Sequence, residues 1–182
     1  MTGNETIMIE HDKIVEYVRS ATADVFFTML AMQVTPKPEH VEQAPPMIAD
    51  GVMALVGLAG PCTGAGVITC GTAFAIEVCN HLLMAEETSV NEDVLDAMGE
   101  VANMIIGNFK TLAEEHVGPL CLSIPTVIHG RNFTSRSIGN TAWVVLPFEC
   151  NGDVMQIRIC LATSRSPVAP RAGTLHPVAI LG

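Results

Sequence analysis

The sequence predicts an α+β domain of two pseudo-symmetric halves, with long helices on one face of a mixed or antiparallel β-sheet. Hydrophobic residues make up 49% of the 182 residues and charged residues 15%, so most of the chain must be packed rather than disordered. The expected order is helix, two or three strands, short helix, long helix and three strands, which favours antiparallel pairing over a parallel doubly wound sheet. A short match between Phe26-Phe-Thr28-Met29 and Phe109-Lys-Thr111-Leu112, near the ends of two helices, fits two related halves.

The first half contains a helix, a connector, two strands and a second helix. Apolar residues recur at helical spacing before the connector, and four prolines limit regular structure within it. Two aliphatic runs joined by a glycine-rich loop predict antiparallel strands. The expected bounds are His11–Gln33 for the helix, residues 35–46 for the connector with a short edge strand around Val41, Met53–Ala59 and Gly66–Cys70 for the strands, and Thr72–Met84 for the second helix.

The second half opens with a long helix, whose start is marked by a capping-box pattern at Ser89 and Glu92 and whose end is expected near His116. Pro125 and Pro147 place two of the following strands at sheet edges or bulges, because proline cannot donate to a ladder. The expected strands are Leu122–Ile128, Ala142–Phe148 and Val154–Leu161, the last two joined at Asn151-Gly152. Residues 1–163 are predicted to form a single domain, followed by a Pro/Gly-rich tail over residues 164–182.

Charge and hydropathy exclude several classes of function. The formal net charge of −10 argues against binding to nucleic acid or to an anionic membrane surface. The longest apolar stretch, Met53–Ile76, is broken by Pro61 and five glycines, so no membrane span is expected. The N-terminus lacks the features of a secretion signal, and we expect a cytoplasmic protein. Its six cysteines, with no C-x-x-C pair and no ligand-like histidine spacing, are expected to be reduced core residues rather than zinc ligands.

The long helix carries two distinct faces. Its expected buried face comprises Val94, Met98, Val101, Ile105, Phe109 and Leu112. The opposite stripe, which must face solvent or a partner, comprises Asp96, Glu100, Asn103, Gly107 and Lys110. Gly99 and Gly107 each cost helix stability of about 1 kcal/mol relative to alanine, which would be explained if another backbone came close to them.

The carboxamide of Asn103 could orient a water for attack on phosphorus, while Glu100, one turn earlier, could pair with a cation of a partner. The E-x-x-N spacing alone also fits an ordinary solvent-exposed helix face. It occurs a second time at Glu77 and Asn80, without flanking glycines.

The run Asp96-Ala-Met-Gly-Glu100-Val-Ala-Asn103, followed by Leu122-Ser-Ile-Pro-Thr-Val-Ile128, resembles the CheX branch of the CheC/CheX/FliY phosphatases of bacterial chemotaxis. The resemblance covers about residues 11–162. It implies hydrolysis of the aspartyl phosphate on a CheY-like response regulator, with Glu100 contacting a regulator lysine and Asn103 orienting the hydrolytic water. Asp96 is then the leading acid of the motif. The Mg²⁺ would belong to the regulator, so the chain would need no cofactor of its own.

The resemblance also bears on the first helix and on assembly. CheC-type members carry the motif on both related helices, whereas Tyr17 and Ser20 stand at the corresponding positions of the first helix here, as in a CheX-like protein with one active helix. Members of this branch tend to form homodimers. Besides the phosphatase, two interpretations stay open: a non-catalytic scaffold module that binds a response regulator, and a self-contained hydrolase using Asp96 and Glu100 as acid/base or Mg²⁺-binding carboxylates.

Overall fold

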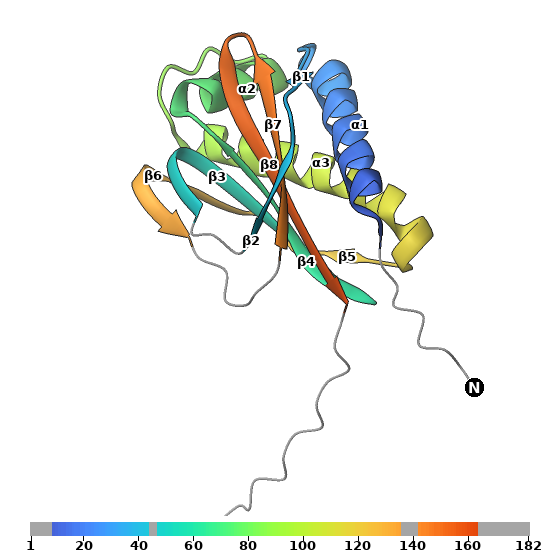
Figure 1. Cartoon of the computed structure of the whole chain (residues 1–182). Coiled ribbons are helices and arrows are strands. Elements are labelled where there is room, and N and C mark those ends of the chain that lie inside the picture. The colour runs from blue at the N-terminus through green and yellow to red at the C-terminus, as the bar shows by residue number, and fades with distance from the viewer. Residues whose placement is uncertain (1–8, 44–46, 136–141, 164–182) are drawn as a thin grey trace, which may run out of the picture.

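The computed structural model describes residues 9–43, 47–135 and 142–163, which form three helices and eight strands (Figure 1). The helices are α1 (His11–Leu30), α2 (Thr72–Leu83) and α3 (Glu92–Val117). The strands are β1 (Thr35–Pro36), β2 (His40–Gln43), β3 (Met47–Ala59), β4 (Cys62–Cys70), β5 (Cys121–Leu122), β6 (Thr126–Ser135), β7 (Ala142–Cys150) and β8 (Asp153–Thr163).

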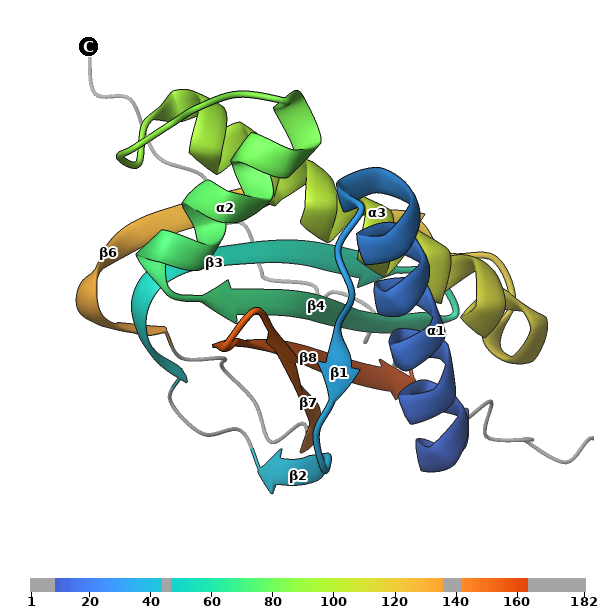
Figure 2. The same ribbon diagram turned by 90° about the horizontal axis from the view of Figure 1, so that it is seen from above.

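The strands form one sheet in which every described pairing is antiparallel. Its order is β1-β7-β8-β4-β3-β5, with β2 also pairing with β7 and β6 with β3. Residues of all three helices share one buried cluster with one face of the sheet, and α2 and α3 lie beyond β3 in the view from above (Figure 2). The predicted α+β class and the layer of helices on one face are confirmed.

The main core lies between the helices and the sheet. Val52, Ala54 and Val56 of β3 belong to the same buried cluster as most of the inward face of α3. Met53 belongs instead to a smaller cluster, because successive side chains of a strand point to opposite faces. That smaller cluster, which also contains Val67, Trp143 and Cys160, marks the face of the sheet opposite the helices.

Helix α3 begins at a different cap from the one predicted. Asn91, not Ser89, is the N-cap, and its Oδ1 accepts a hydrogen bond from the Val94 N–H at 3.1 Å. The Asn91 amide in turn donates to Glu87 Oε2 at 2.7 Å. Asparagine is at least as good an N-cap as serine, and this second contact fixes its side chain, so the capping-box prediction is wrong by two residues. The other end, Val117, agrees with the prediction.

The strand predicted over Leu122–Ile128 is two strands. Ser123 separates them because its N–H donates to the Gly57 carbonyl at 2.9 Å while its Oγ accepts from the Gly57 N–H at 2.8 Å. The hydroxyl thus replaces a strand carbonyl, and Pro125, which has no N–H, lies in the gap before β6.

Pro147 does not mark an edge or a bulge, contrary to prediction. β7 is paired on both sides, with β8 along one side and with β1 and β2 along the other. The adjacent edge is broken opposite the proline: β1 ends at Pro36, β2 starts at His40, and the Lys37 N–H between them donates to the Pro147 carbonyl at 2.9 Å. The strand therefore tolerates proline because its neighbour is interrupted there.

Smaller differences concern helix ends and one thiol. α1 ends at Leu30 rather than at Gln33, because Ala31, the next residue, adopts a left-handed conformation that terminates the helix. None of the six cysteines forms a disulfide, but Cys121 is exposed, so the prediction that all six lie in the core is wrong for this residue. Burial raises the pKa of the Cys70 thiol to about 12. Among the described helices, none combines the length and the apolarity that a membrane crossing requires.

One close contact sets how near α3 lies to the sheet. An added Cβ at Gly66 of β4 would lie 2.2 Å from Ile106 Cδ1 and 2.7 Å from Ile106 Cγ1. Because several atoms of this buried side chain are too close, rotation of its tip cannot relieve the clash. Gly66 is therefore required for α3 to seat on β4.

We expect Gly66→Ala to destabilise the protein by about 1–3 kcal/mol, because Ile106 and the helix must shift. Ile106→Ala, which empties the same space, should cost less in the Gly66→Ala background than in wild type. Urea unfolding of the four proteins of this double-mutant cycle measures the coupling. Strictly additive effects would contradict the contact.

Candidate functional site

The candidate functional residues predicted from the sequence lie on the outward-facing stripe of α3. Asp96 and Glu100 are exposed in the structure, and Asn103 is half-buried. Within the described part of the chain, none of these three side chains has a hydrogen bond or an ion pair. The stripe thus presents two carboxylates and one carboxamide whose polar atoms are available to a partner.

The positions of the two carboxylates lower the stability of the helix. Asp96 and Glu100 stand at i and i+4, where like charges destabilise a helix by about 0.2–0.5 kcal/mol. The helix dipole favours acidic residues only in the first turn, which here contains Glu92 and Asp93. Neither the dipole nor an ion pair within the described residues therefore accounts for Asp96 and Glu100, so their placement suits an external cation.

Lys110, the cation predicted for the same stripe, is engaged within the chain. Its Nζ lies 2.7 Å from Glu114 Oε1, which also accepts the Leu120 N–H at 2.7 Å. The hydrogen bonds from Lys110 and Leu120 hold the pKa of the Glu114 carboxyl below its usual range. Lys110 thereby helps to fix the end of α3 to the start of β5.

The two glycines of α3 face side chains of the segment that contains β5 and the start of β6 in this same chain. Gly99 is buried, and an added Cβ there would lie 3.2 Å from Val127 Cγ2 and 3.6 Å from Pro125 Cβ. A Cβ at Gly107 would lie 3.7 Å from Leu122 Cδ1. The chain segment that comes close to Gly99 is thus this chain's own, between β5 and β6, and contact of either glycine with a partner stays a prediction.

This arrangement explains why the two motifs of the sequence belong together. Residues 122–127 run along α3 in the opposite direction, from Gly107 to Gly99, and Ser123 ties them to Gly57 of β3. Asn103 stands midway between the glycines on the same i±4 row, which accounts for its being half-buried. The Ser-Ile-Pro-Thr-Val run thus walls one side of the row that holds the candidate amide.

The second E-x-x-N pattern is used for structure. The Asn80 amide donates to the Glu87 carbonyl at 3.0 Å, and its Oδ1 accepts from the Glu87 N–H at 2.7 Å. Glu77 accepts a hydrogen bond from Asn151 Nδ2 at 2.6 Å. Both side chains are occupied: Asn80 closes the connection from α2 to α3, and Glu77 links α2 to the turn between β7 and β8. This pair offers no free amide.

The first helix offers no equivalent of the α3 pair either. Tyr17, which corresponds to Glu100 in the internal match, shares a hydrogen bond of 2.8 Å with His116 Nε2 and stacks on its ring. Ser20, which corresponds to Asn103, is exposed. The described structure therefore presents the free carboxylate and amide on α3 and not on α1.

A cleft of about 570 Å³ lies next to Glu100. Its outer wall is formed by Leu82 and Leu83 at the end of α2. The sequence does not predict this wall, because a helix end carries no periodic signal that distinguishes a cleft from the core. The remaining lining residues are Asp93, Leu95, Asp96, Ala97, Gly99, Pro125 and Val127. The cleft is open, with apolar walls and three carboxylates.

The self-contained hydrolase finds little support in this geometry. Within the described residues, no group of three or more histidine, cysteine or acidic side chains converges as metal ligands would. Asp96 and Glu100 line an open cleft rather than the enclosed pocket that such a mechanism needs.

Comparisons with known proteins agree on one family. The family model for "Chemotaxis phosphatase CheX" matches residues 52–149, more than half of the chain. A chemotaxis protein CheX from Desulfovibrio desulfuricans is 28% identical, with a TM-score of 0.75 over 82% of this chain and 99% of that one. CheX from Vibrio vulnificus is 24% identical, with a TM-score of 0.73 over 82% and 99%. A CheX–CheY–BeF3–Mg²⁺ complex from Borrelia burgdorferi is 25% identical, with a TM-score of 0.64 over 81% and 97%. Curated proteins gave no match.

We expect Gly107→Ala to stabilise the protein by about 0.5–1 kcal/mol, because alanine favours the helix and its Cβ would meet only an ordinary contact with Leu122. Gly99→Ala should gain less, since its Cβ is crowded by Val127. Chemical unfolding of the two variants beside wild type measures the difference. Equal stabilisation at both sites would contradict the tighter packing at Gly99.

Proposed function

The chain belongs to the CheX family of chemotaxis phosphatases, and from this premise we propose that it hydrolyses the aspartyl phosphate of a CheY-like response regulator. In this proposal Asn103 orients the hydrolytic water and Glu100 docks on a lysine of the regulator. The observation that carries it is the pair of free polar side chains, one helical turn apart, on the exposed face of α3. The family membership and the CheX–CheY complex from Borrelia burgdorferi support the choice of partner.

An amide suits the chemistry proposed for Asn103. The oxygen of the attacking water forms a bond to phosphorus, and the bond from phosphorus to the aspartyl oxygen breaks with its electron pair left on the carboxylate. The water proton passes to the released phosphate or to solvent. Asn103 Oδ1 can accept a hydrogen bond from the water and Nδ2 can donate to a phosphoryl oxygen, which places the water in line without an added base. Mg²⁺ on the regulator would offset the phosphoryl charge.

Glu100 supplies docking rather than chemistry in this mechanism. Its carboxylate is exposed and unpaired within the described residues, next to a second carboxylate at Asp96. A regulator lysine that approaches this pair relieves their mutual repulsion and gains a charge-assisted hydrogen bond. With a net charge of −10 on the chain, association with a basic contact face should weaken as ionic strength rises.

Asn103→Ala should lower the rate of dephosphorylation by about 10²-fold or more, because the water loses its position, while binding of the regulator is retained. The measurement is the decay of a phosphorylated CheY-type regulator with Mg²⁺ at saturating amounts of each variant. Asn108→Ala is the matched control, since Asn108 is an exposed asparagine on the same helix outside the row of Asn103.

Two results would sink the assignment. If Asn103→Ala dephosphorylates as fast as wild type, the amide does not orient the water. If wild type binds a regulator without accelerating its decay, the protein is the non-catalytic scaffold module instead. Loss of activity in Asn108→Ala to the same extent would point to a general disturbance of α3.

Glu100→Lys should separate function from stability. The change converts the repulsive Asp96–Glu100 pair into an attractive i,i+4 pair and should stabilise the helix by about 0.5 kcal/mol. Binding to the regulator should nevertheless fall, because two cations now face each other. Thermal unfolding and regulator titration on the same sample test this prediction, and a variant that is both less stable and inactive would contradict it.

A further inference from the structure

The cleft beside Glu100 has apolar walls that the proposed roles of Asn103 and Glu100 do not use. Leu82 and Leu83 come from α2, Leu95 from α3, and Pro125 and Val127 from the β5–β6 segment. Leu83 is 51% exposed, and Leu82, Leu95 and Val127 are half-buried. Apolar side chains that solvent reaches together at one cleft, rather than scattered singly, mark an interaction site.

The cleft also has a strongly one-sided charge. Asp93, Asp96 and Glu100 line it, and no lysine or arginine does. Within the described residues none of the three carboxylates forms an ion pair. A ligand that fits these walls must combine an apolar group with positive charge.

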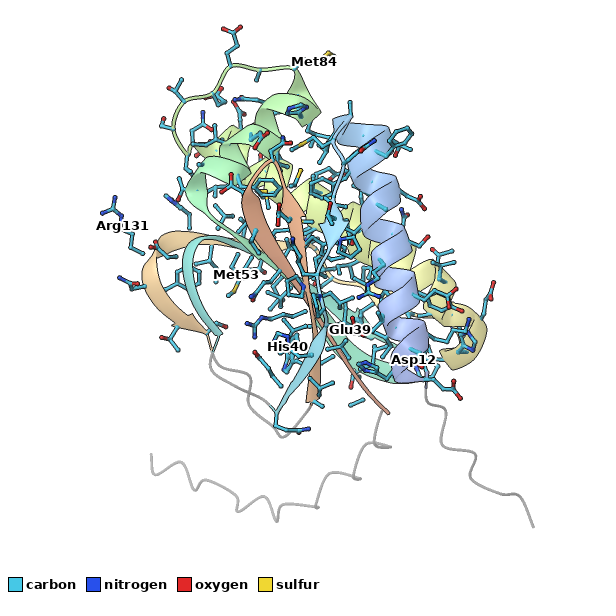
Figure 3. All side chains as sticks on the ribbon, turned by 45° about the horizontal axis from the view of Figure 1, so that its top comes forward. Asp12, Glu39, His40, Met53, Met84 and Arg131 are labelled. Carbon is cyan, nitrogen blue, oxygen red and sulfur yellow. The ribbon has the colours of Figure 1, made fainter. Side chains whose placement is uncertain are left out.

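The outer wall is held rigidly in place. His81 Nδ1 donates to the Leu30 carbonyl at 2.8 Å, which ties the end of α2 to α1. The Asn80 amide makes both of its hydrogen bonds to the Glu87 backbone, which fixes the turn that follows. Met84 at this turn projects away from the ribbon and is 94% exposed (Figure 3). A preorganised wall loses little entropy when a partner binds and can therefore select among partners.

We infer that this cleft receives an apolar side chain of the response regulator, flanked by a lysine or arginine, and that the end of α2 thereby selects the cognate regulator. The inference rests on the proposed function, because it takes the regulator as the occupant. The cleft is continuous with the proposed docking site, which supports this choice. Glu100 lines the cleft, is the residue proposed to contact the regulator lysine, and lies one turn from Asn103. The cleft then contributes to affinity and specificity, and the amide to the chemical step.

The test is kinetic, with Leu83→Ser and Leu83→Lys. Both variants change an exposed side chain, so the fold should be kept, and thermal unfolding checks this. We expect KM for the phosphorylated regulator to rise about tenfold or more in Leu83→Ser, and further in Leu83→Lys, with kcat within twofold of wild type. Val154→Ser is the control, because Val154 is 53% exposed and lies outside the cleft.

A second arm examines the charge. Asp96→Asn should flatten the dependence of KM on ionic strength, since one carboxylate facing the basic partner is lost. An unchanged salt dependence would overturn the basic component of the proposed ligand.

Failure of this inference can be told apart from failure of the phosphatase proposal. If wild type accelerates decay and both Leu83 variants have an unchanged KM, the cleft is not the docking site although the phosphatase stands. If wild type does not accelerate decay, the docking inference is tested by binding of the beryllofluoride-activated regulator, measured by fluorescence anisotropy. Weaker binding of the Leu83 variants then supports the docking cleft alone, and an absence of binding by wild type overturns it.

Discussion

The close seating of α3 is the constraint on which the rest of the structure depends. The helix is held on one side by β4, where Gly66 leaves room for Ile106, and on the other by the β5–β6 segment, which packs on Gly99. Ser123 ties that segment to Gly57 of the sheet. With both sides fixed, rotation of α3 about its axis is set, and the row that carries Asn103 emerges at one defined angle.

The chain separates side chains that hold the fold from side chains left for a partner. Asn80 and Glu114 resemble Asn103 and Glu100 chemically, yet both are fully engaged, with the Glu87 backbone and with Lys110 and Leu120 respectively. The free pair makes no such contact in the described residues. Residue type and spacing alone therefore do not distinguish the proposed pair from Asn80 and Glu114, whereas the lack of an internal partner does.

Much of the fold could be predicted because its signals are local. Helical and strand periodicity indicated α2, α3, β4 and the β7–β8 hairpin, with ends that shifted by a few residues. The errors have non-local causes. Asn91 replaced Ser89 as the cap because Glu87 fixes its side chain, and Pro147 fits inside the sheet because a strand distant in sequence is interrupted opposite it. Likewise the segment that approaches Gly99 is this chain's own, at Pro125 and Val127, which lie far from it in sequence, and Leu83 gave no signal at all. The homodimer implied by the resemblance stays a prediction.

The exposed position of the proposed docking residues has a consequence for how such a protein changes over time. Leu83, Asp96 and Glu100 contribute little to the buried core, so in the proposed docking, substitutions there alter partner choice while the free energy of unfolding is nearly constant. A duplicated copy could thus acquire a new regulator through a handful of surface changes. Two parallel signalling circuits in one cell could then be kept insulated from each other without any redesign of the scaffold.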